Sequence, residues 1–322
     1  MVDVLSESAI ESVLDLSVLV DVVGEALQKQ AAGDVERPER PHFPVGTGLD
    51  GPEPEGTGLT MSAYIHGEPY YATKLASVHE DNTERGLPTV NAQIVLTDAK
   101  TGQPAAVMGG QTITNARTAC IGALAVREFA SATETLGVIG AGAQARWQTR
   151  AIATVADLTD VRIYSPSESR EVCASDLQRR TVPARAVETP AEAVDGADTV
   201  VTATTATEPV FPAEALPAGA LVVAVGAYTA EMQELPPAVL EQAEAVYADV
   251  PAEVAETGDL LATSLEAGDL RAFGGVFGAS LSNERTVVAS VGSATMDAAA
   301  AAALYRRARE RETGTAVSLD GT

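Results

Sequence analysis

The stretch TLGVIGAGAQARWQTRAI, residues 135–152, consists of a short apolar run, two glycines and a segment with apolar residues at helical spacing. The apolar run predicts a buried strand that ends at Ile139, and the last segment predicts a helix. Gly140 permits a tight turn between them, Gly142 lets a ligand approach the backbone, and Ala145 lets the helix pack closely on a sheet. A glycine pattern alone also fits an ordinary strand–helix turn. The flanking strand and helix nevertheless favour a site that binds dinucleotide phosphates at the helix N-terminus.

The chain around this turn alternates between strands and helices. Such alternation is typical of a parallel, doubly wound sheet, so we expect one dinucleotide-binding Rossmann domain over residues 119–295. The predicted strands cover residues 135–140, 160–165, 198–205, 220–226, 243–249 and 286–292, and the predicted helices cover residues 143–155 and 168–180.

Residues 1–118 follow a different pattern, in which strand-like runs are separated by turn residues. This pattern predicts a mostly antiparallel sheet followed by a helix. An alanine-rich run from Met296 predicts a C-terminal helix, and residues 296–322 are expected to return to this first domain. The predicted segments are amphipathic helices in residues 1–30, a Pro- and Gly-rich loop at about 31–60, strands at 59–65, 69–78 and 89–98, and a helix at 112–130.

The charge balance is strongly acidic, with 45 acidic and 21 basic residues and a formal net charge of −24. This balance disfavours nucleic acid as a partner. The acidic residues are spread along the chain rather than gathered in one block, which favours a solvated surface adapted to a salt-rich cytoplasm over a site for a cationic partner. Lysine is scarce, so Lys74 in the partly apolar run EPYYATKLASV is a candidate site residue, although an ordinary edge-strand lysine is the alternative.

The sequence gives no indication of a membrane span, a signal peptide, a metal site or a disulfide framework. No apolar run approaches the ~20 residues of a membrane span, and the acidic N-terminus is unlike a signal peptide, so we expect a cytoplasmic protein without a membrane partner. Cys120 and Cys173 lie far apart, and the three histidines lack the spacing of zinc ligands, so no metal site or disulfide framework is expected.

The end of the second strand of the Rossmann pattern indicates the form of the cofactor. A carboxylate there usually binds the ribose hydroxyls of NAD, whereas this chain has Ser165, Ser167 and Arg170. Hydroxyls and a guanidinium can bind a 2′-phosphate, which favours NADP(H), with NAD(H) as the alternative. Glu168 counts against this interpretation, and Arg170 could instead simply begin a solvent-facing helix.

Six motifs follow one another along nearly the whole chain. They are KLASV at 74–78, GLPTVNAQIVLTDAKTGQPAAVMGGQTITNARTA at 86–119, GAGAQA at 140–145, GADTVVTATT at 196–205, VGAYTAEMQEL at 225–235 and SVGSATMD at 290–297. Together they resemble the ornithine cyclodeaminase/mu-crystallin family. The resemblance implies a Rossmann domain inserted into an α+β substrate and dimerisation domain formed by both chain ends. It also implies a small amino or imino acid substrate and a homodimer.

The resemblance also implies which residues bind the substrate. Arg40, Lys74 and Arg117 match the family's ligands for the substrate α-carboxylate, and guanidinium groups suit that role because they bind carboxylates in a bidentate manner. Arg37 competes with Arg40, since the sequence ERPERP repeats, and surface ion pairs are the alternative role for each arginine. Lys74 is the expected group that polarises the reacting centre.

Further matches concern the cofactor. Besides Gly140 and Gly142, the resemblance implies a further set of nucleotide contacts, which are Thr89, Arg117, Ala143, Gln144, Thr204, Val225 and Ser290. The alternative for Thr204 is that it reflects only the ordinary β-propensity of threonine. Val291 matches a residue that contacts the substrate.

One departure from the family pattern bears on the reaction. Cyclodeaminases carry an aspartate after the VG strand end, where this chain has Tyr228, and a phenol with a pKa of ~10 cannot replace a carboxylate as a base near neutrality. Glu231 could substitute only with a rearranged loop. Tyr228 is kept as a substrate-pocket residue, and Asp297 is expected mainly to stabilise a helix N-terminus.

We therefore expect an NAD(P)H-dependent reductase of a cyclic imino acid, of the Δ1-pyrroline-2-carboxylate or Δ1-piperideine-2-carboxylate type. The alternatives are an ornithine cyclodeaminase with bound NAD, an alanine dehydrogenase-like enzyme, and a non-catalytic NADP-binding protein.

Overall fold

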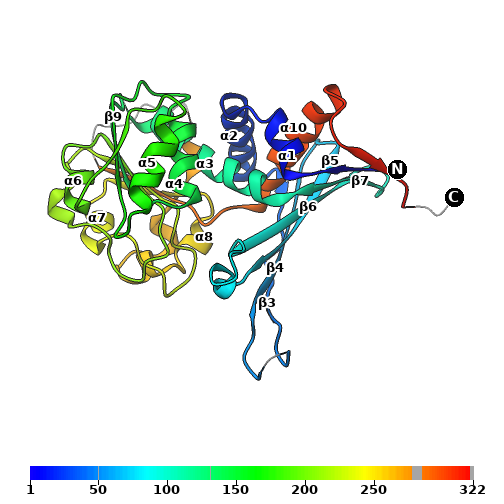
Figure 1. Ribbon diagram of the computed structural model, residues 1–322, viewed down its shortest axis with the longest axis horizontal. Coiled ribbons are helices and arrows are strands. Elements are labelled where there is room, and N and C mark those ends of the chain that lie inside the picture. The colour runs from blue at the N-terminus through cyan, green and yellow to red at the C-terminus, as the bar shows by residue number, and fades with distance from the viewer. Residues whose placement is uncertain (50, 131, 278–284, 320–322) are drawn as a thin grey trace. The chain divides into compact units, whose positions relative to one another are not determined.

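The computed structural model describes residues 1–49, 51–130, 132–277 and 285–319 (Figure 1). The chain forms two compact units. The first unit consists of Met1–Asp15, Ala32–Arg117 and Ser293–Thr322, and the second consists of Leu16–Ala31 and Thr118–Gly292. No helix in the described ranges has both the length and the apolar character needed to cross a membrane.

The first unit contains a mixed sheet with the strand order β16-β1-β7-β6-β5-β4-β2, and β3 pairs with β4 (Figure 1). Strands β4 to β7 are antiparallel, whereas β1 runs parallel to β7 and antiparallel to β16. The strands are β1 (Val2–Leu5), β2 (Val35–Glu36), β3 (His42–Val45), β4 (Gly56–Ile65), β5 (Tyr70–Val78), β6 (Val90–Asp98), β7 (Pro104–Gly109) and β16 (Thr315–Val317).

The two faces of this sheet differ in what covers them. Helix α10 (Ala294–Glu310) packs against β4 and β5. The alternation of side chains along each strand places a row of residues on the covered face, where Met61, Lys74, Ile94 and Met108 pair across β4, β5, β6 and β7. All four are buried. Lys74 is therefore a cation within an otherwise apolar row.

The expected strands at 59–65, 69–78 and 89–98 and their antiparallel pairing are confirmed. Two expectations were wrong. Residues 2–5 form strand β1 before the helix α1 (Glu7–Val13), and the stretch 31–60 contains β2, β3 and the start of β4 rather than only a loop. Strand β7 was also missed. Short strands such as β1 lack a recognisable period of their own, and they form because neighbours distant in the sequence provide hydrogen-bond partners.

The second unit contains a sheet of eight parallel strands in the order β10-β9-β8-β11-β12-β15-β13-β14. All strands expected in this region are confirmed. The order reverses at β8, which lies between β9 and β11, and ligands of doubly wound sheets bind at the carboxyl ends of the strands at such a point. The strands are β8 (Thr135–Ile139), β9 (Asp160–Tyr164), β10 (Ala184–Ala186), β11 (Thr199–Thr202), β12 (Leu221–Ala224), β13 (Ala245–Ala248), β14 (Arg271–Ala272) and β15 (Thr286–Ala289).

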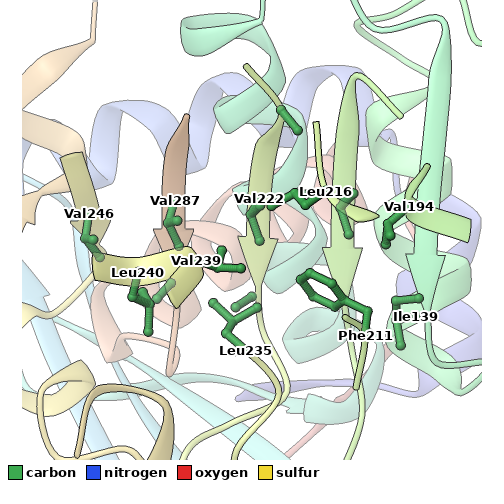
Figure 2. Packing of buried hydrophobic residues seen from close by; sticks show 14 of the residues in the cluster. Ile139, Val194, Phe211, Leu216, Val222, Leu235, Val239, Leu240, Val246 and Val287 are labelled. Atoms are coloured by element: carbon green, nitrogen blue, oxygen red, sulfur yellow. The ribbon is translucent and has the colours of Figure 1, made fainter. Parts of the chain in front are cut away.

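A continuous apolar core supports this second sheet. Figure 2 shows Leu235, Val239 and Leu240, which follow β12 in the sequence, packed against the apolar side chains of the strands. Every residue of β11, β12 and β15 is buried, as expected for strands covered on both faces. The helices are α4 (Ala143–Ile152), α5 (Ser169–Gln178), α6 (Pro190–Val194), α7 (Pro237–Glu241), α8 (Pro251–Val254) and α9 (Gly258–Leu261), with short 3-10 helices at Ala213–Ala215, Ala267–Asp269 and Phe273–Val276.

The units are divided after Arg117 and after Gly292, close to the boundaries expected at 118 and 295, and they differ from the expected domains mainly in the placement of one N-terminal helix. Helix α2 (Leu16–Ala32) belongs almost entirely to the second unit, because it packs on α3 (Gly110–Phe129). A Cβ at Gly24 would lie 3.1 Å from the Leu124 side chain, and Asp21 forms an ion pair of 2.6 Å with Arg127. The C-terminal helix α10 belongs to the first unit, so both chain ends contribute to that unit.

Candidate functional site

Lys74, Arg117 and Asp297 meet in the first unit although they come from β5, α3 and α10. Lys74 Nζ lies 2.6 Å from Asp297 Oδ2, and Arg117 Nε donates to Asp297 Oδ1 over 2.9 Å. The three side chains are 4%, 5% and 1% exposed. They form a buried ion triad of two cations and one anion, with a formal charge of +1.

Burial and charge shift the pKa values of the triad in opposite directions. Burial, with a further contribution from the nearby Arg117 charge, lowers the pKa of Lys74 to about 8, against the attraction of Asp297. Burial opposes ionisation of Asp297 as well, but the charges of Arg117 and Lys74 outweigh it and hold the Asp297 pKa below its usual range. The Asp297 carboxylate is therefore ionised at neutral pH. The Lys74 ammonium group loses its proton at a pH slightly above neutrality.

Asp297 has a larger role than the one expected for it. It does lie in the first turn of α10, after the N-cap Ser293, where a carboxylate is favourable. Its two oxygens, however, also bind the two cations that the sequence assigned to the substrate. Without Asp297 those two cations would be buried beside one another without compensation.

The N-terminal arginines lie on the segment between β2 and β3, and each is half-buried. The charge of Arg40 contributes to lowering the Lys74 pKa, so Arg40 acts electrostatically on the triad. Thr89 also belongs to the first unit, where its carbonyl accepts a hydrogen bond of 2.9 Å from the His79 backbone. The other residues assigned to the nucleotide, apart from Arg117, belong to the second unit.

The glycine turn in the second unit has the geometry that a nucleotide-binding turn requires. Gly140 has φ of +112°, and a Cβ there would lie 2.4 Å from the Ala203 carbonyl oxygen, so only glycine fits. Gly142 is the N-cap of α4, and apart from its chain neighbours no atom of the described residues lies within 4 Å of the position that a Cβ would take there. Ala145 is fully buried against the sheet. Ala143 and Gln144 follow in the first turn of α4, so their backbone N–H groups belong to the helix N-terminus.

The residues assigned to a 2′-phosphate gather after β9. The Ser165 and Ser167 hydroxyls both hydrogen-bond the Ser169 hydroxyl, at 3.1 and 2.8 Å. Arg170 is already paired, because its guanidinium lies 2.9 Å from Glu188 Oε2 and 3.0 Å from Glu171 Oε1. A 2′-phosphate would thus compete with these carboxylates for Arg170.

The ends of β11 and β12 carry the next group of predicted residues. Val225 donates its N–H to the Thr202 carbonyl over 3.0 Å, and Tyr228 is 48% exposed on the loop that follows. The Thr204 N–H donates to Glu234 Oε1 over 2.6 Å. Glu234 was not among the predicted residues, since neither of the two glutamates in EMQELPP stands in a pattern that indicates burial.

Glu234 and its neighbour Asp259 are two buried carboxylates beneath these strand ends. Asp259 Oδ1 accepts the backbone N–H groups of Glu234 and Leu235, both over 2.7 Å. Burial, reinforced by the Asp259 charge, raises the pKa of Glu234 to about 7, and burial raises the pKa of Asp259 to about 6.

Ser290 and Val291 follow β15 and are held by Asp249, which directly follows β13. Asp249 accepts the Ser290 hydroxyl over 2.7 Å and the Val291 and Gly292 N–H groups over 3.2 and 2.8 Å. The Ser290 hydroxyl is therefore bound to a carboxylate, and Val291 packs against the core of the second unit. Asp249 was also missed by the sequence analysis.

Comparison with known proteins places these features in context. The sequence pattern of the ornithine cyclodeaminase/mu-crystallin family matches residues 1–312. The chain is 31% identical over 325 residues to a Δ1-pyrroline-2-carboxylate reductase of Bacillus cereus, covering 97% of this chain and 98% of that protein.

Solved structures agree with this match. The structure of Thermococcus litoralis Δ1-pyrroline-2-carboxylate reductase in complex with NADH and L-proline is similar with a TM-score of 0.90 and 28% identity, covering 98% of this chain and 100% of that one. An archaeal alanine dehydrogenase dimer with bound NAD gives a TM-score of 0.88 and 26% identity, covering 99% of each chain.

Proposed function

The chain belongs to the ornithine cyclodeaminase/mu-crystallin family, and from this we propose that it reduces the C=N bond of a cyclic imino acid of the Δ1-pyrroline-2-carboxylate type, using a nicotinamide cofactor. The observation that carries this proposal is the buried triad of Lys74, Arg117 and Asp297. The proposed product is L-proline or its six-membered homologue.

The triad suits the substrate's carboxylate in charge and in chemistry. Its formal charge of +1, with Arg40 as a further cation, makes the binding of an anion favourable in a buried place. Arg117 can offer its terminal N–H groups to a carboxylate in a bidentate manner while Nε stays bound to Asp297. Asp297 keeps the two cations in place before the substrate arrives. We assign Arg40, rather than Arg37, as the third carboxylate ligand because its charge acts on Lys74.

The glycine turn fits the pyrophosphate of a dinucleotide. Gly140 allows the close turn, Gly142 leaves open space on the side where a Cβ would stand, and α4 begins there, so the positive end of its dipole lies at the turn. Ser165, Ser167 and Arg170 are proposed to bind the adenosine ribose or its phosphate, while Thr204, Val225 and Ser290 would border the nicotinamide half. A bound nicotinamide cofactor supplies the hydride for the reduction.

The residues of the chain then orient and polarise the substrate. The hydride adds to the imine carbon, and the nitrogen keeps the proton with which the iminium arrives, so C=NH⁺ becomes CH–NH. No strong acid is needed from the protein. With its carboxylate bound at the triad, the substrate would have its reacting carbon near Lys74, and the positive charge of Lys74 would stabilise the electron density that this carbon receives.

Cyclodeamination is disfavoured at Tyr228, where the family's cyclodeaminases have an aspartate. Tyr228 is 48% exposed and carries a phenol in place of a carboxylate, and Glu231 is exposed in the same loop. An ornithine cyclodeaminase would release ammonia without net consumption of cofactor, which a direct assay distinguishes from reduction.

We also propose NADP(H) as the preferred cofactor and a homodimer as the assembly. The hydroxyls of Ser165 and Ser167 and the guanidinium of Arg170 suit a 2′-phosphate, provided that the phosphate displaces Glu188. The dimer is proposed to form through the sheet face opposite α10. Tyr71 and Leu75 point from that face, and they are 37% and 42% exposed.

The proposed function is tested by following the oxidation of NADPH and NADH in concentrated KCl. The substrates are Δ1-pyrroline-2-carboxylate, Δ1-piperideine-2-carboxylate, pyruvate with ammonia, and ornithine. We expect rapid oxidation with a cyclic imino acid and loss of that activity in Arg117→Met. Ammonia release from ornithine, activity confined to pyruvate, or binding of nucleotide without any turnover would each replace this proposal by one of its alternatives.

A further inference from the structure

Glu234 is a fully buried carboxylate that the proposed chemistry does not use. Its Oε1 accepts the Thr204 N–H over 2.6 Å, and its Oε2 accepts the Gly226 N–H over 2.8 Å and the Thr202 hydroxyl over 3.0 Å. One side chain thus holds the backbone just beyond β11 and just beyond β12. Both points lie at the carboxyl edge of the parallel sheet, where doubly wound folds bind their ligands.

The three loops at this edge are in close contact, so a shift in one affects the others. A Cβ at Gly226 would lie 2.3 Å from the Thr204 carbonyl oxygen and 2.5 Å from Glu234 Oε1. A Cβ at Gly140, in the glycine turn, would lie 2.4 Å from the Ala203 carbonyl oxygen. The turn after β8 therefore rests on the segment after β11, and that segment is held by Glu234.

The position of Glu234 is itself fixed. Asp259 accepts the Glu234 and Leu235 backbone N–H groups, and Leu235 is fully buried in the core of the unit (Figure 2). This arrangement buries two carboxylates near each other, which opposes folding because each charge loses its hydration. An apolar side chain could fill the same volume without that cost, but it could not accept the two backbone N–H groups from neighbouring strand ends.

We infer that Glu234 is a positioning residue for the cofactor: its carboxylate sets the backbone of Thr204 and Gly226, and through them the turn at Gly140, in the geometry that binds the nicotinamide dinucleotide. This inference rests on the proposed function. Asp259 serves it indirectly by holding the backbone of Glu234.

The test compares three variants within the second unit. Glu234→Gln keeps the shape but turns an amide NH₂ towards one of the N–H donors. Thr202→Val removes one hydrogen bond to Glu234. Thr199→Val is the matched control, because Thr199 lies three residues earlier in the same strand, is equally buried, and bonds Thr133 at the far end of β11.

Three measurements follow for each variant and for the wild type: Kd for NADPH and NADH from nicotinamide fluorescence, the KM values for cofactor and imino acid, and amide hydrogen exchange. We expect Glu234→Gln to raise the cofactor Kd and KM by about tenfold, since the amide replaces one of two acceptor oxygens by a donor and leaves a buried backbone N–H without an acceptor. The KM for the imino acid should stay within about twofold, because the triad that binds it belongs to the first unit. Thr202→Val should show a smaller change of the same kind.

Hydrogen exchange gives a readout that does not depend on cofactor. The amides of Thr204 and Gly226 should exchange faster in Glu234→Gln and Thr202→Val, but not in Thr199→Val, even where all three lower the Tm. Equal effects in all three variants, or unchanged cofactor affinity in Glu234→Gln, would reduce Glu234 to a residue of general stability. A wild-type protein that binds neither nucleotide would instead refute the proposed function itself.

Discussion

At the scale of single residues, Lys74 depends on its surroundings for its chemistry. In water a lysine is charged at any physiological pH, whereas burial beside Arg117 lowers the pKa of Lys74 to about 8. The same residue in an exposed strand would be an ordinary surface cation. The resemblance to a family selected Lys74, but its lowered pKa follows from burial on the covered face of the sheet and from the charge of Arg117, against the opposing attraction of Asp297, which the sequence analysis had placed in a helix-stabilising role.

The lowered pKa predicts a pH dependence of ligand binding. The ammonium form of Lys74 is present below pH 8 and is lost above it, so the affinity for a carboxylate ligand should fall as the pH rises through about 8. We expect the Kd for L-proline, measured by calorimetry between pH 6.5 and 9.5, to increase over this range. Lys74→Met should weaken binding at pH 7 by about tenfold or more, since a hydrogen bond to a charged group contributes roughly 1.5–3 kcal/mol.

Lys74→Arg serves as the control for this experiment, because arginine keeps its charge across the whole range. Its affinity for L-proline should not decline between pH 7 and pH 9.5. If the wild type and Lys74→Arg decline in parallel, the titrating group is not Lys74.

Arg170 carries the prediction on cofactor preference. Its pairing with Glu188 means that a 2′-phosphate must displace a carboxylate. We expect Glu188→Gln to increase kcat/KM for NADPH relative to NADH, and Arg170→Ala to decrease kcat/KM for NADPH by about tenfold with little effect on NADH, since only the phosphate needs the guanidinium.

Arg179→Ala is the matched control, because it removes one positive charge at the end of α5 whose partners are Ser175 and Asp176. It should leave the ratio of NADPH to NADH activity unchanged. An unchanged ratio in Arg170→Ala would show that this region does not select the cofactor.

At the scale of elements, the sheet of the first unit has two unlike faces. One carries the row of Met61, Lys74, Ile94 and Met108 under α10. On the other face, among the described residues, side chains such as Tyr71 and Leu75 are substantially exposed. Because the side-chain period of a strand is two, a register shift of one residue would exchange these faces and remove Lys74 from the triad. The strands would therefore serve both the proposed substrate site and the proposed assembly.

The exposed face predicts how the homodimer can be disrupted. We expect Leu75→Glu to convert the protein to a monomer in sedimentation velocity experiments, since the substitution would bury a charge at the interface. Val172→Glu is the control, as Val172 is 57% exposed on α5 of the second unit. A Leu75→Glu protein that still sediments as a dimer would place the interface elsewhere.

At the scale of the whole molecule, the charge of −24 influences every element at once. Self-repulsion at this charge destabilises a compact state, and salt screens it, because the Debye length falls from ~10 Å at 0.1 M to ~3 Å at 1 M. The adaptation to a salt-rich cytoplasm that we proposed from composition therefore concerns the stability of the folded protein in salt and not its fold.

We therefore expect the Tm to rise steadily between 0.1 and 2 M KCl. Chloride is the appropriate salt, because sulfate also stabilises folded proteins by exclusion from their surfaces. A Tm that is constant or falls over this range would contradict the proposed adaptation to salt.

The sequence alone was sufficient for the features that depend on local physics. Six of the eight strands of the second unit were recognisable because buried parallel strands are continuous apolar runs, whereas the short strands β10 and β14 were not predicted. The turn at Gly140 was recognisable because a strand–glycine–helix transition is specified within a few residues. Lys74 and Arg117 were selected through a resemblance that extends over the chain.

Only the tertiary structure decided which distant groups meet. Asp297 lies 180 residues from Arg117 in sequence, Glu234 lies 30 residues from Thr204, and β1 exists because β7 and β16 flank it. Whether a side chain is buried, and which group a charge pairs with, depends on segments that come together only on folding. No local pattern of residues predicts either property. For this reason the sequence analysis missed Glu234 and gave Asp297 only a helix-stabilising role.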